Sequence, residues 1–169
     1  MDIRECFCSQ YYASLEMLQQ AVVKCPDSLW NDMNNKNKFW HIAYHTLFYT
    51  HMYLQEHEKT FIPWVKHRNQ YQFMGSVPWP PYERPKIEEP YNKSDVSEFL
   101  LVCQNEIELK LPATDMSTPS GFHWLPFTKF ELQLYNIRHI QHHTGQLFGR
   151  LGMQSDVKLQ WIFSKNTAK

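Results

Sequence analysis

Apolar residues recur at every third or fourth position in four long segments of the chain, at about residues 2–24, 37–58, 95–111 and 128–152. This spacing places the apolar side chains on one face of an α-helix. No segment shows the sustained alternation that is typical of a β-strand. We therefore predict an all-α fold in which the four helices bury their apolar faces against one another as a four-helix bundle.

The start of the last helix has the clearest signal in the sequence. Thr128 and Glu131 form a Thr-x-x-Glu capping box, and Phe127 and Leu132 flank it as a hydrophobic staple. Gly152 marks the expected end of this helix, since glycine often follows a helix C-terminus. The last helix is therefore predicted to begin directly after Thr128.

The limits of the other helices are indicated by prolines and polar caps. Pro26 ends the first helix because proline lacks an amide hydrogen. Asn35 or Asn37 is the expected cap of the second helix. The third helix is predicted to begin near Asp95, with Glu98 three residues further on.

The connection between the second and third helices, at about residues 60–93, is exceptionally long and contains several prolines and tryptophans. So long a loop in a compact domain is usually functional or a crossover. Its length allows it to travel along the bundle, which would leave the second and third helices parallel.

We predict one domain over residues 1–169, ending in an arm at about 153–169 that packs on the bundle or on a partner subunit. The arm has alternating apolar residues, Val157, Leu159, Trp161 and Phe163.

The composition of the chain excludes some classes of function. The 17 basic and 17 acidic residues cancel, so no net field favours nucleic acid or an anionic membrane as partner. The first residues lack the apolar core of a signal peptide, and no apolar run reaches the length of a membrane span. We therefore expect a cytoplasmic protein.

Four cysteines are present, and their spacing matches no zinc finger or zinc ribbon. In a reducing compartment we expect reduced, partly buried thiols. A redox pair of Cys6 and Cys8 is the alternative, although on a helix these two residues point to different faces.

Three histidines fall within five positions of the last helix: His139, His142 and His143. His139 and His143 are four residues apart, so both imidazoles lie on the same helix face. Two neutral imidazole nitrogens at this spacing reach one metal ion at about 2.0–2.1 Å each. Such a pair also occurs in proteins without a metal, so a third ligand is needed to complete the argument.

The second helix offers the third ligand. His45 lies near its middle, at the depth of His139 and His143 if the two helices are antiparallel. His41 shares the face of His45 and is a substitute ligand or a neighbour of the site. The other histidines are predicted to lie on the surface or in loops, although the tryptophan-flanked loop of the last one could fold over the bundle end: His51, His57, His67 and His123.

These residues resemble the DinB/YfiT-like metal-dependent bundle proteins. The resemblance rests on His45 within the run 43–47, and on His139 and His143 followed by Gly145 and Gln146, about 95 residues later. It extends over nearly the whole chain, including the four helices and the long second connection.

The resemblance implies an up-down-down-up bundle, often a homodimer, in which three histidines bind one divalent ion. Carried over by position, the ligands would be His45, His139 and His143. The ion would be zinc or nickel, with iron or manganese as alternatives. Family activities include transfer of a low-molecular-weight thiol to small molecules, and metal-dependent hydrolysis. The chain departs from the simplest family pattern by carrying His41 and His142 beside the expected ligands.

Three functions are consistent with such a site: a thiol S-transferase acting on small electrophiles, a hydrolase, and a non-catalytic metal-binding or interaction protein. Three neutral imidazoles leave coordination positions of the ion open. A thiol, whose free pKa is about 8.5, or a water would lose its proton more readily there. The catalytic residues stay unassigned, since nothing in the sequence places the helical carboxylates Glu56 and Glu131 at the ion.

Overall fold

The computed structural model describes residues 2–165, and every regular element in that range is helical. Among these residues the only β-type pairing is an isolated bridge between Pro119 and Thr128. None of the described helices is long and apolar enough to cross a membrane. The all-α prediction is confirmed.

The elements are α1 (Ile3–Lys24), α2 (Asp27–Trp30), α3 (Phe39–Tyr53), the 3-10 turn η1 (Glu58–Thr60), α4 (Lys93–Lys110), the 3-10 turn η2 (Leu111–Ala113) and α5 (Lys129–Gln154).

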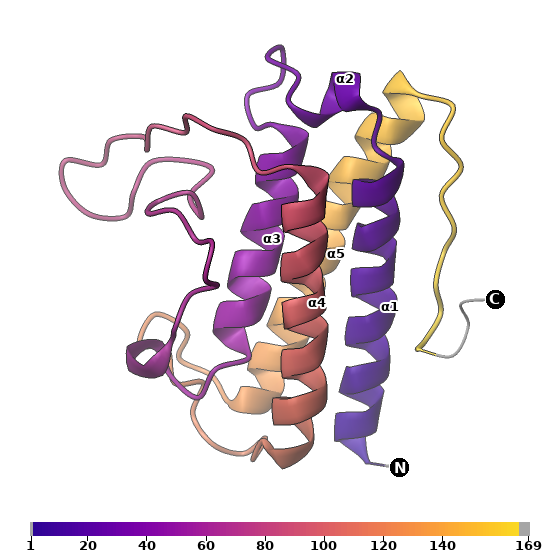
Figure 1. The fold of residues 1–169 in the computed structure, drawn as a ribbon. Helices are drawn as coiled ribbons and strands as arrows, with labels where there is room; N and C mark the ends of the chain where they lie inside the picture. The colour runs from indigo at the N-terminus through magenta and orange to yellow at the C-terminus, as the bar shows by residue number, and fades with distance from the viewer. Residues whose placement is uncertain (1, 166–169) are drawn as a thin grey trace.

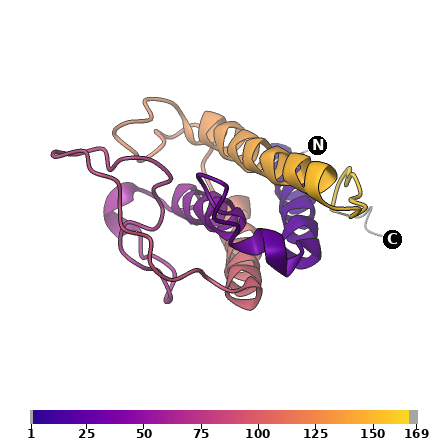
Figure 2. The same ribbon diagram turned by 90° about the horizontal axis from the view of Figure 1, so that it is seen from above.

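The helices α1, α3, α4 and α5 lie side by side as a helical bundle (Figure 1). α1 and α3 each pack mainly against α4 and α5, so α4 and α5 lie on opposite sides of the bundle when it is seen from above (Figure 2). The long connection leaves the lower end of α3 and returns to the upper end of α4 along one side of the bundle (Figure 1).

The predicted apolar stripes form the core. On α1 the stripe side chains are all buried, and the same holds for the stripe on α4. Each large apolar side chain that leaves water in this way contributes about 1.5–3 kcal/mol. Packing of the amphipathic faces therefore holds the helices together. The stripe residues are Phe7, Tyr11, Leu15, Leu18 and Val22 on α1, and Val96, Phe99, Leu100, Cys103 and Ile107 on α4.

The Thr128 half of the predicted capping box is present at the start of α5. The Thr128 hydroxyl accepts a hydrogen bond from the backbone N–H of Glu131, at 3.4 Å. Leu132 is fully buried, and Phe127 packs against the same apolar cluster. The start of α5 is thereby fixed, and with it the positions of the histidines further along the helix.

α5 continues through Gly152, its predicted end, to Gln154, and the limits of two other helices also differ from the prediction. α4 begins at Lys93 rather than near Asp95, because the Asn92 side chain accepts from the N–H of Asp95 and caps the helix earlier. α3 begins after Lys38 without a side-chain cap, so neither Asn35 nor Asn37 has the predicted capping role.

α3 also ends at Tyr53, well before the predicted limit near residue 58. The Lys129 ammonium group on α5 donates to the main-chain oxygens of Gln55 and Glu56, at 2.8 and 2.6 Å. These carbonyls are satisfied by a residue distant in sequence, and the N–H of Glu58, which a longer helix would bond to Leu54, donates to the oxygen of Gly121 instead.

A short helix that the sequence did not indicate, α2, follows directly after Pro26. Proline is compatible with the first residues of a helix, so Pro26 ends α1 and also precedes a new turn. The Trp30 side chain at the end of α2 is buried and donates from Nε1 to the main-chain oxygen of Tyr91, at 2.8 Å.

The C-terminal arm packs along α1 as far as it is described, while residues 166–169 of the predicted arm lie outside the described range. Gln20 Nε2 and Lys24 Nζ on α1 donate to main-chain oxygens of the arm. The predicted alternation is wrong beyond residue 160: Ile162 is buried, whereas Trp161 and Phe163 are exposed. Ile162 packs in a small cluster with α1 side chains, which sets the side of the arm that faces the bundle.

All four cysteines are free. Cys25 and Cys103 are buried, while Cys6 and Cys8 are partly buried. Burial raises the pKa of Cys8 and raises that of Cys25 to about 12, so both thiols are protonated at neutral pH. The described geometry agrees with the prediction of unpaired, partly buried thiols.

Candidate metal centre

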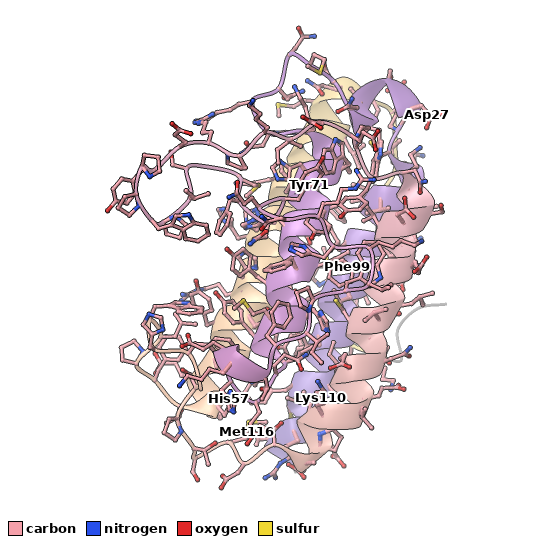
Figure 3. All side chains as sticks on the ribbon, turned by 60° about the vertical axis from the view of Figure 1, so that its left-hand side comes forward. Asp27, His57, Tyr71, Phe99, Lys110 and Met116 are labelled. Atoms are coloured by element: carbon pink, nitrogen blue, oxygen red, sulfur yellow. The ribbon has the colours of Figure 1, made fainter. Side chains whose placement is uncertain are left out.

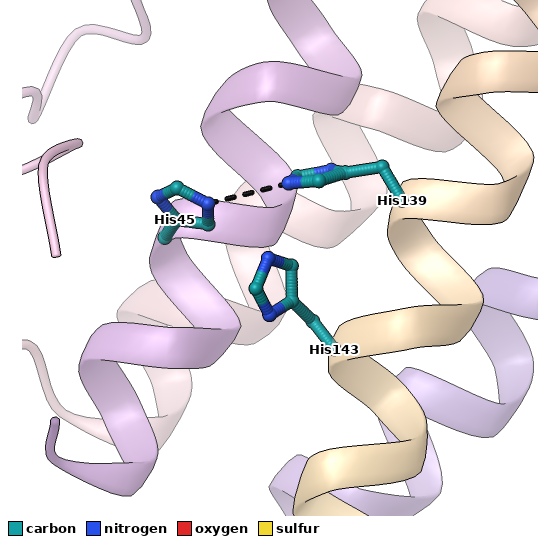
Figure 4. Close-up of side chains that lie close together, drawn as sticks. All are labelled: His45, His139 and His143. Atoms are coloured by element: carbon teal, nitrogen blue, oxygen red, sulfur yellow. Dashed lines mark hydrogen bonds between the residues drawn. The ribbon is translucent and has the colours of Figure 1, made fainter.

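Three histidines meet between α3 and α5 (Figure 4). His45 comes from α3, and His139 and His143 come from successive turns of α5. Their ring centres lie 4.6 to 5.2 Å apart, and the Nε2 atoms of His45 and His139 are separated by 3.2 Å. Each ring offers one nitrogen within 4.8 Å of the other two. We call this cluster the histidine triad.

The register between α3 and α5 places the triad. Asn136 Nδ2 on α5 donates to the main-chain oxygen of Thr50 on α3, at 3.2 Å. About four turns along α5, Arg150 donates to the main-chain oxygen of Asn37, just before α3, at 2.7 Å. The partner number falls as the α5 number rises, so the two helices are antiparallel. Together the two hydrogen bonds hold His45 opposite the paired histidines of α5.

Two further hydrogen bonds fix which ring nitrogen faces the centre of the triad. The Nδ1–H of His45 donates to the main-chain oxygen of Gln72, at 2.6 Å, so its Nε2 carries a free lone pair. The Nδ1–H of His143 donates to Oε1 of Gln146, at 2.9 Å, with the same consequence. The Gln146 amide in turn donates from Nε2 to Nε2 of His142, at 3.1 Å. A metal-binding histidine commonly has its outer nitrogen held in this way.

The triad is uncharged at neutral pH. Burial, helped by the neighbouring imidazoles and opposed by the hydrogen bond to Gln72, lowers the pKa of His45 to about 3. Burial likewise lowers the pKa of His139 to about 3, and it lowers the pKa of His143. Neutral imidazole is the form that binds metal ions, so these rings are in the required state without losing a proton.

Two of the three donors lie at a distance that fits a divalent ion, and the third is within 4.8 Å of both. Two nitrogens that each lie about 2.1 Å from one ion are at most about 4.2 Å apart, and the 3.2 Å between His45 and His139 is within that limit. In the structure the Nε2–H of His139 donates to Nε2 of His45, and a bound cation would take the place of that proton between the two nitrogens (Figure 4). Comparison of the chain with protein-family models, with curated proteins and with solved structures finds no match in any of the three. The nitrogen geometry itself is therefore the evidence for a metal site.

The triad is accessible from the surface of α5. A small cleft of about 260 Å³ is lined by Tyr135, Arg138, His139 and His142. One triad ring thus borders space that a small molecule can enter. A metal held here would keep positions for an exogenous ligand, unlike a structural site whose four ligands all come from the protein.

His41 and His142 lie near the triad but outside it. His41 is buried, and its Nε2 is 2.7 Å from the main-chain oxygen of Tyr71, which occupies that nitrogen. His142 is exposed and contacts the triad through Gln146. The metal-ligand geometry therefore includes neither of the two extra histidines.

The surface prediction for the remaining histidines is wrong for His51, which is 6% exposed and packs edge-on against Phe61 and Phe99. The long connection covers the face of α3 that helical periodicity would leave in water. His67 lies in a loop, as predicted, and is half-buried there because its Nδ1 contacts the hydroxyl of Tyr44 on α3, at 2.5 Å.

The other two histidines agree better with the prediction. His57 is half-exposed and lies next to η1. His123 is exposed in the connection between α4 and α5, and its Nδ1 is 2.7 Å from a carboxylate oxygen of Glu58. Glu56, which lies beyond the end of α3 and not in a helix as predicted, and Glu131 on α5 are both exposed, and no carboxylate within residues 2–165 joins the triad.

Sequence reasoning missed Gln72 and Tyr49. Tyr49 lies one turn beyond His45, and its ring contacts both His45 and His139, with ring centres 4.9 and 5.8 Å apart. Its helical spacing from His45 could have indicated this role. Gln72 comes from the long connection, where no periodicity gives the position of a residue in space.

Proposed function

We propose that this chain is a DinB/YfiT-like protein in which His45, His139 and His143 bind one divalent ion, and that it transfers a low-molecular-weight thiol to small electrophiles. The observation that carries the proposal is the convergence of three neutral imidazoles between antiparallel neighbours, with two nitrogens 3.2 Å apart. The up-down-down-up order and the homodimer of that family are part of the proposal. The course of the long connection back along the bundle supports the order (Figure 1).

The triad has the donors for the proposed cofactor. Imidazole nitrogen suits zinc and nickel, and iron and manganese are the alternatives. When bound, such an ion supplies a Lewis acid that lowers the pKa of a thiol or a water at an open position. The residues of the chain hold the nitrogens neutral and oriented, and the cleft beside His139 admits the thiol.

The proposed transfer balances as a substitution. The thiol gives up its proton to solvent, and its sulfur forms a bond to the electrophilic carbon. The bond from that carbon to a halide breaks, and the halide leaves with the bonding electrons. Burial around His45 and His139 excludes much of the competing water, which favours sulfur as the nucleophile. Hydrolysis at the same site is the alternative reaction.

The test begins with the metal content of protein purified without an affinity tag. His45→Ala, His139→Ala and His143→Ala should each lose bound metal, while the matched variant His57→Ala, outside the triad, should keep it. Chelation should leave the far-ultraviolet circular dichroism nearly unchanged, because the apolar core that holds the helices together does not include the triad histidines. Full metal content in the three triad variants would contradict the ligand assignment.

The reaction is then tested by a pH–rate series with several thiols and a reactive halide. The rate should depend on metal and persist below the free thiol pKa of about 8.5. In His143→Ala the rate below the free thiol pKa should be lost. A rate that follows free thiolate alone and is equal in the variant would contradict thiol transfer, and release of product without thiol would favour hydrolysis.

A further inference from the structure

A cavity of about 690 Å³ lies beside the triad, on the side of the bundle that carries the long connection. Figure 3 views this side, with Tyr71 of the long connection above and His57 below. One wall is α3, and the others come from the long connection and from the connection between α4 and α5. The lining residues of α3 are Phe48, Tyr49 and Met52, facing Phe73 and Trp79 from one connection and Trp124 from the other.

The cavity is next to the proposed ligands. Tyr49 lines it and packs against both His45 and His139. Gln72 also lines it, and its main-chain oxygen accepts the hydrogen bond from His45. A molecule in the cavity would therefore touch residues that themselves contact the triad, Tyr49 and Gln72.

The lining is mainly aromatic, and its one imidazole close to a carboxylate is that of His123, whose Nδ1 is 2.7 Å from Glu58. Among the described residues that border the cavity there is no aspartate, glutamate, lysine or arginine. Burial lowers the pKa of the lining residue His67, so this imidazole is neutral. A charged ligand would lose its hydration here without gaining a partner charge, whereas a flat ring gains stacking and edge contacts.

Two tryptophans distant in sequence border the same cavity. Trp79 is 46% exposed and packs edge-on against Phe73, and Trp124 is 44% exposed and packs against Phe122. Large apolar side chains that stay partly exposed around one hollow indicate a binding site rather than a core. The volume lies within the range of about 300–1,000 Å³ that is usual for small-molecule sites.

We propose that this cavity binds an uncharged aromatic small molecule. The second part of the proposal is that this molecule is the electrophile that reacts at the triad. This part rests on the proposed function. The aromatic walls hold the ring, and Tyr49, which lines the cavity, is the side chain that lies between the bound molecule and His45 and His139. The specificity of the site thus comes from two connections, while its reactivity comes from two helices.

Binding is tested with the uncharged fluorescent dye N-phenylnaphthylamine and with its sulfonated counterpart, anilinonaphthalene sulfonate. The uncharged dye should bind at one site and more tightly than the sulfonate. Trp79→Ala and Trp124→Ala should each weaken its binding about tenfold, as expected when a ring contact and its buried area are lost. Trp161→Ala is the matched control, because this tryptophan is exposed on the arm along α1 and should leave binding unchanged.

The same variants separate the cavity from the metal chemistry. His143→Ala should lose metal but keep dye binding, and the two tryptophan variants should keep metal. With chlorodinitrobenzene as electrophile, Trp79→Ala should raise KM and leave kcat nearly unchanged, while the KM for iodoacetamide should not change. Dye binding that is equal in wild type, Trp79→Ala and Trp124→Ala would overturn the cavity assignment. Intact dye binding without any conjugation would overturn the proposed function alone.

Discussion

At the scale of single residues, two glutamines determine how the triad presents its nitrogens. Gln72 holds the outer nitrogen of His45 through its main-chain oxygen, and Gln146 holds that of His143 through its side chain. Only Gln146 can be removed by substitution, because a main-chain oxygen is present in every residue. It also lies on the surface, so its replacement disturbs no core packing.

Replacing Gln146 by leucine should lower the metal affinity of the triad about ten- to a hundredfold. Leucine has a similar size but accepts no hydrogen bond, so the proton of His143 is no longer held on Nδ1. Competition with a chelator of known affinity at neutral pH measures the effect. Gln154→Leu, at the exposed end of α5, is the control and should have the affinity of the wild type. Equal affinities for both variants would contradict the positioning role.

The sequence allowed the triad itself to be predicted but not its surroundings. His139 and His143 follow from helical spacing, and His45 follows from matched depth on an antiparallel neighbour. The partner of His45 could not be predicted, because Gln72 reaches the site from a connection with no repeating pattern. Local periodicity gives the face of a helix, whereas the course of a loop depends on contacts distant in sequence.

At the scale of elements, α3 and the long connection behave as one packed unit. Of the 15 residues of α3, 12 are buried, which leaves almost no side of this helix in water. The connection supplies the cover: Trp64 stacks on Phe99 of α4, with ring centres 4.6 Å apart, and Tyr91 stacks on Tyr44 of α3. The connection is therefore part of the core rather than a loose crossover.

Trp64→Ala should lower the free energy of unfolding by about 3–5 kcal/mol, the usual cost of removing a buried tryptophan side chain. Urea unfolding measures this loss. Trp79→Ala, which removes a half-exposed tryptophan of the same connection, should cost far less. If the two variants were equally stable, the connection would not be anchored through Trp64.

The elements also show where periodicity stops being informative. The stripes of α1 and α4 were predictable because one face of each is apolar and packed. The end of α3 was not, since residues 54–58 contain no helix breaker. Beyond Tyr53 the chain follows contacts distant in sequence instead: the N–H of Glu58 donates to the oxygen of Gly121, and Lys129 donates to the carbonyls of Gln55 and Glu56.

At the scale of the whole molecule, buried imidazoles couple stability to pH. Burial lowers the pKa of six histidines in the fold, while an unfolded chain has histidine pKa values near about 6.5. Below that pH the histidines of the unfolded chain bind protons that the buried histidines of the folded chain do not bind. The stabilisation that depends on neutral imidazoles is complete above about pH 6.5 and is lost as pH falls toward the folded pKa values. The six are His41, His45, His51, His67, His139 and His143.

The metal-free protein should therefore become markedly less stable between about pH 7.5 and about pH 5. His45 and His139, whose folded pKa values are about 3, should contribute a loss on the order of 2 kcal/mol each. Urea unfolding at both pH values, with a chelator present, measures this loss. A variant with glutamine at both positions has no proton to take up there and should show a shallower pH dependence. A slope as steep as that of the wild type would mean that these two imidazoles are not buried in their neutral form.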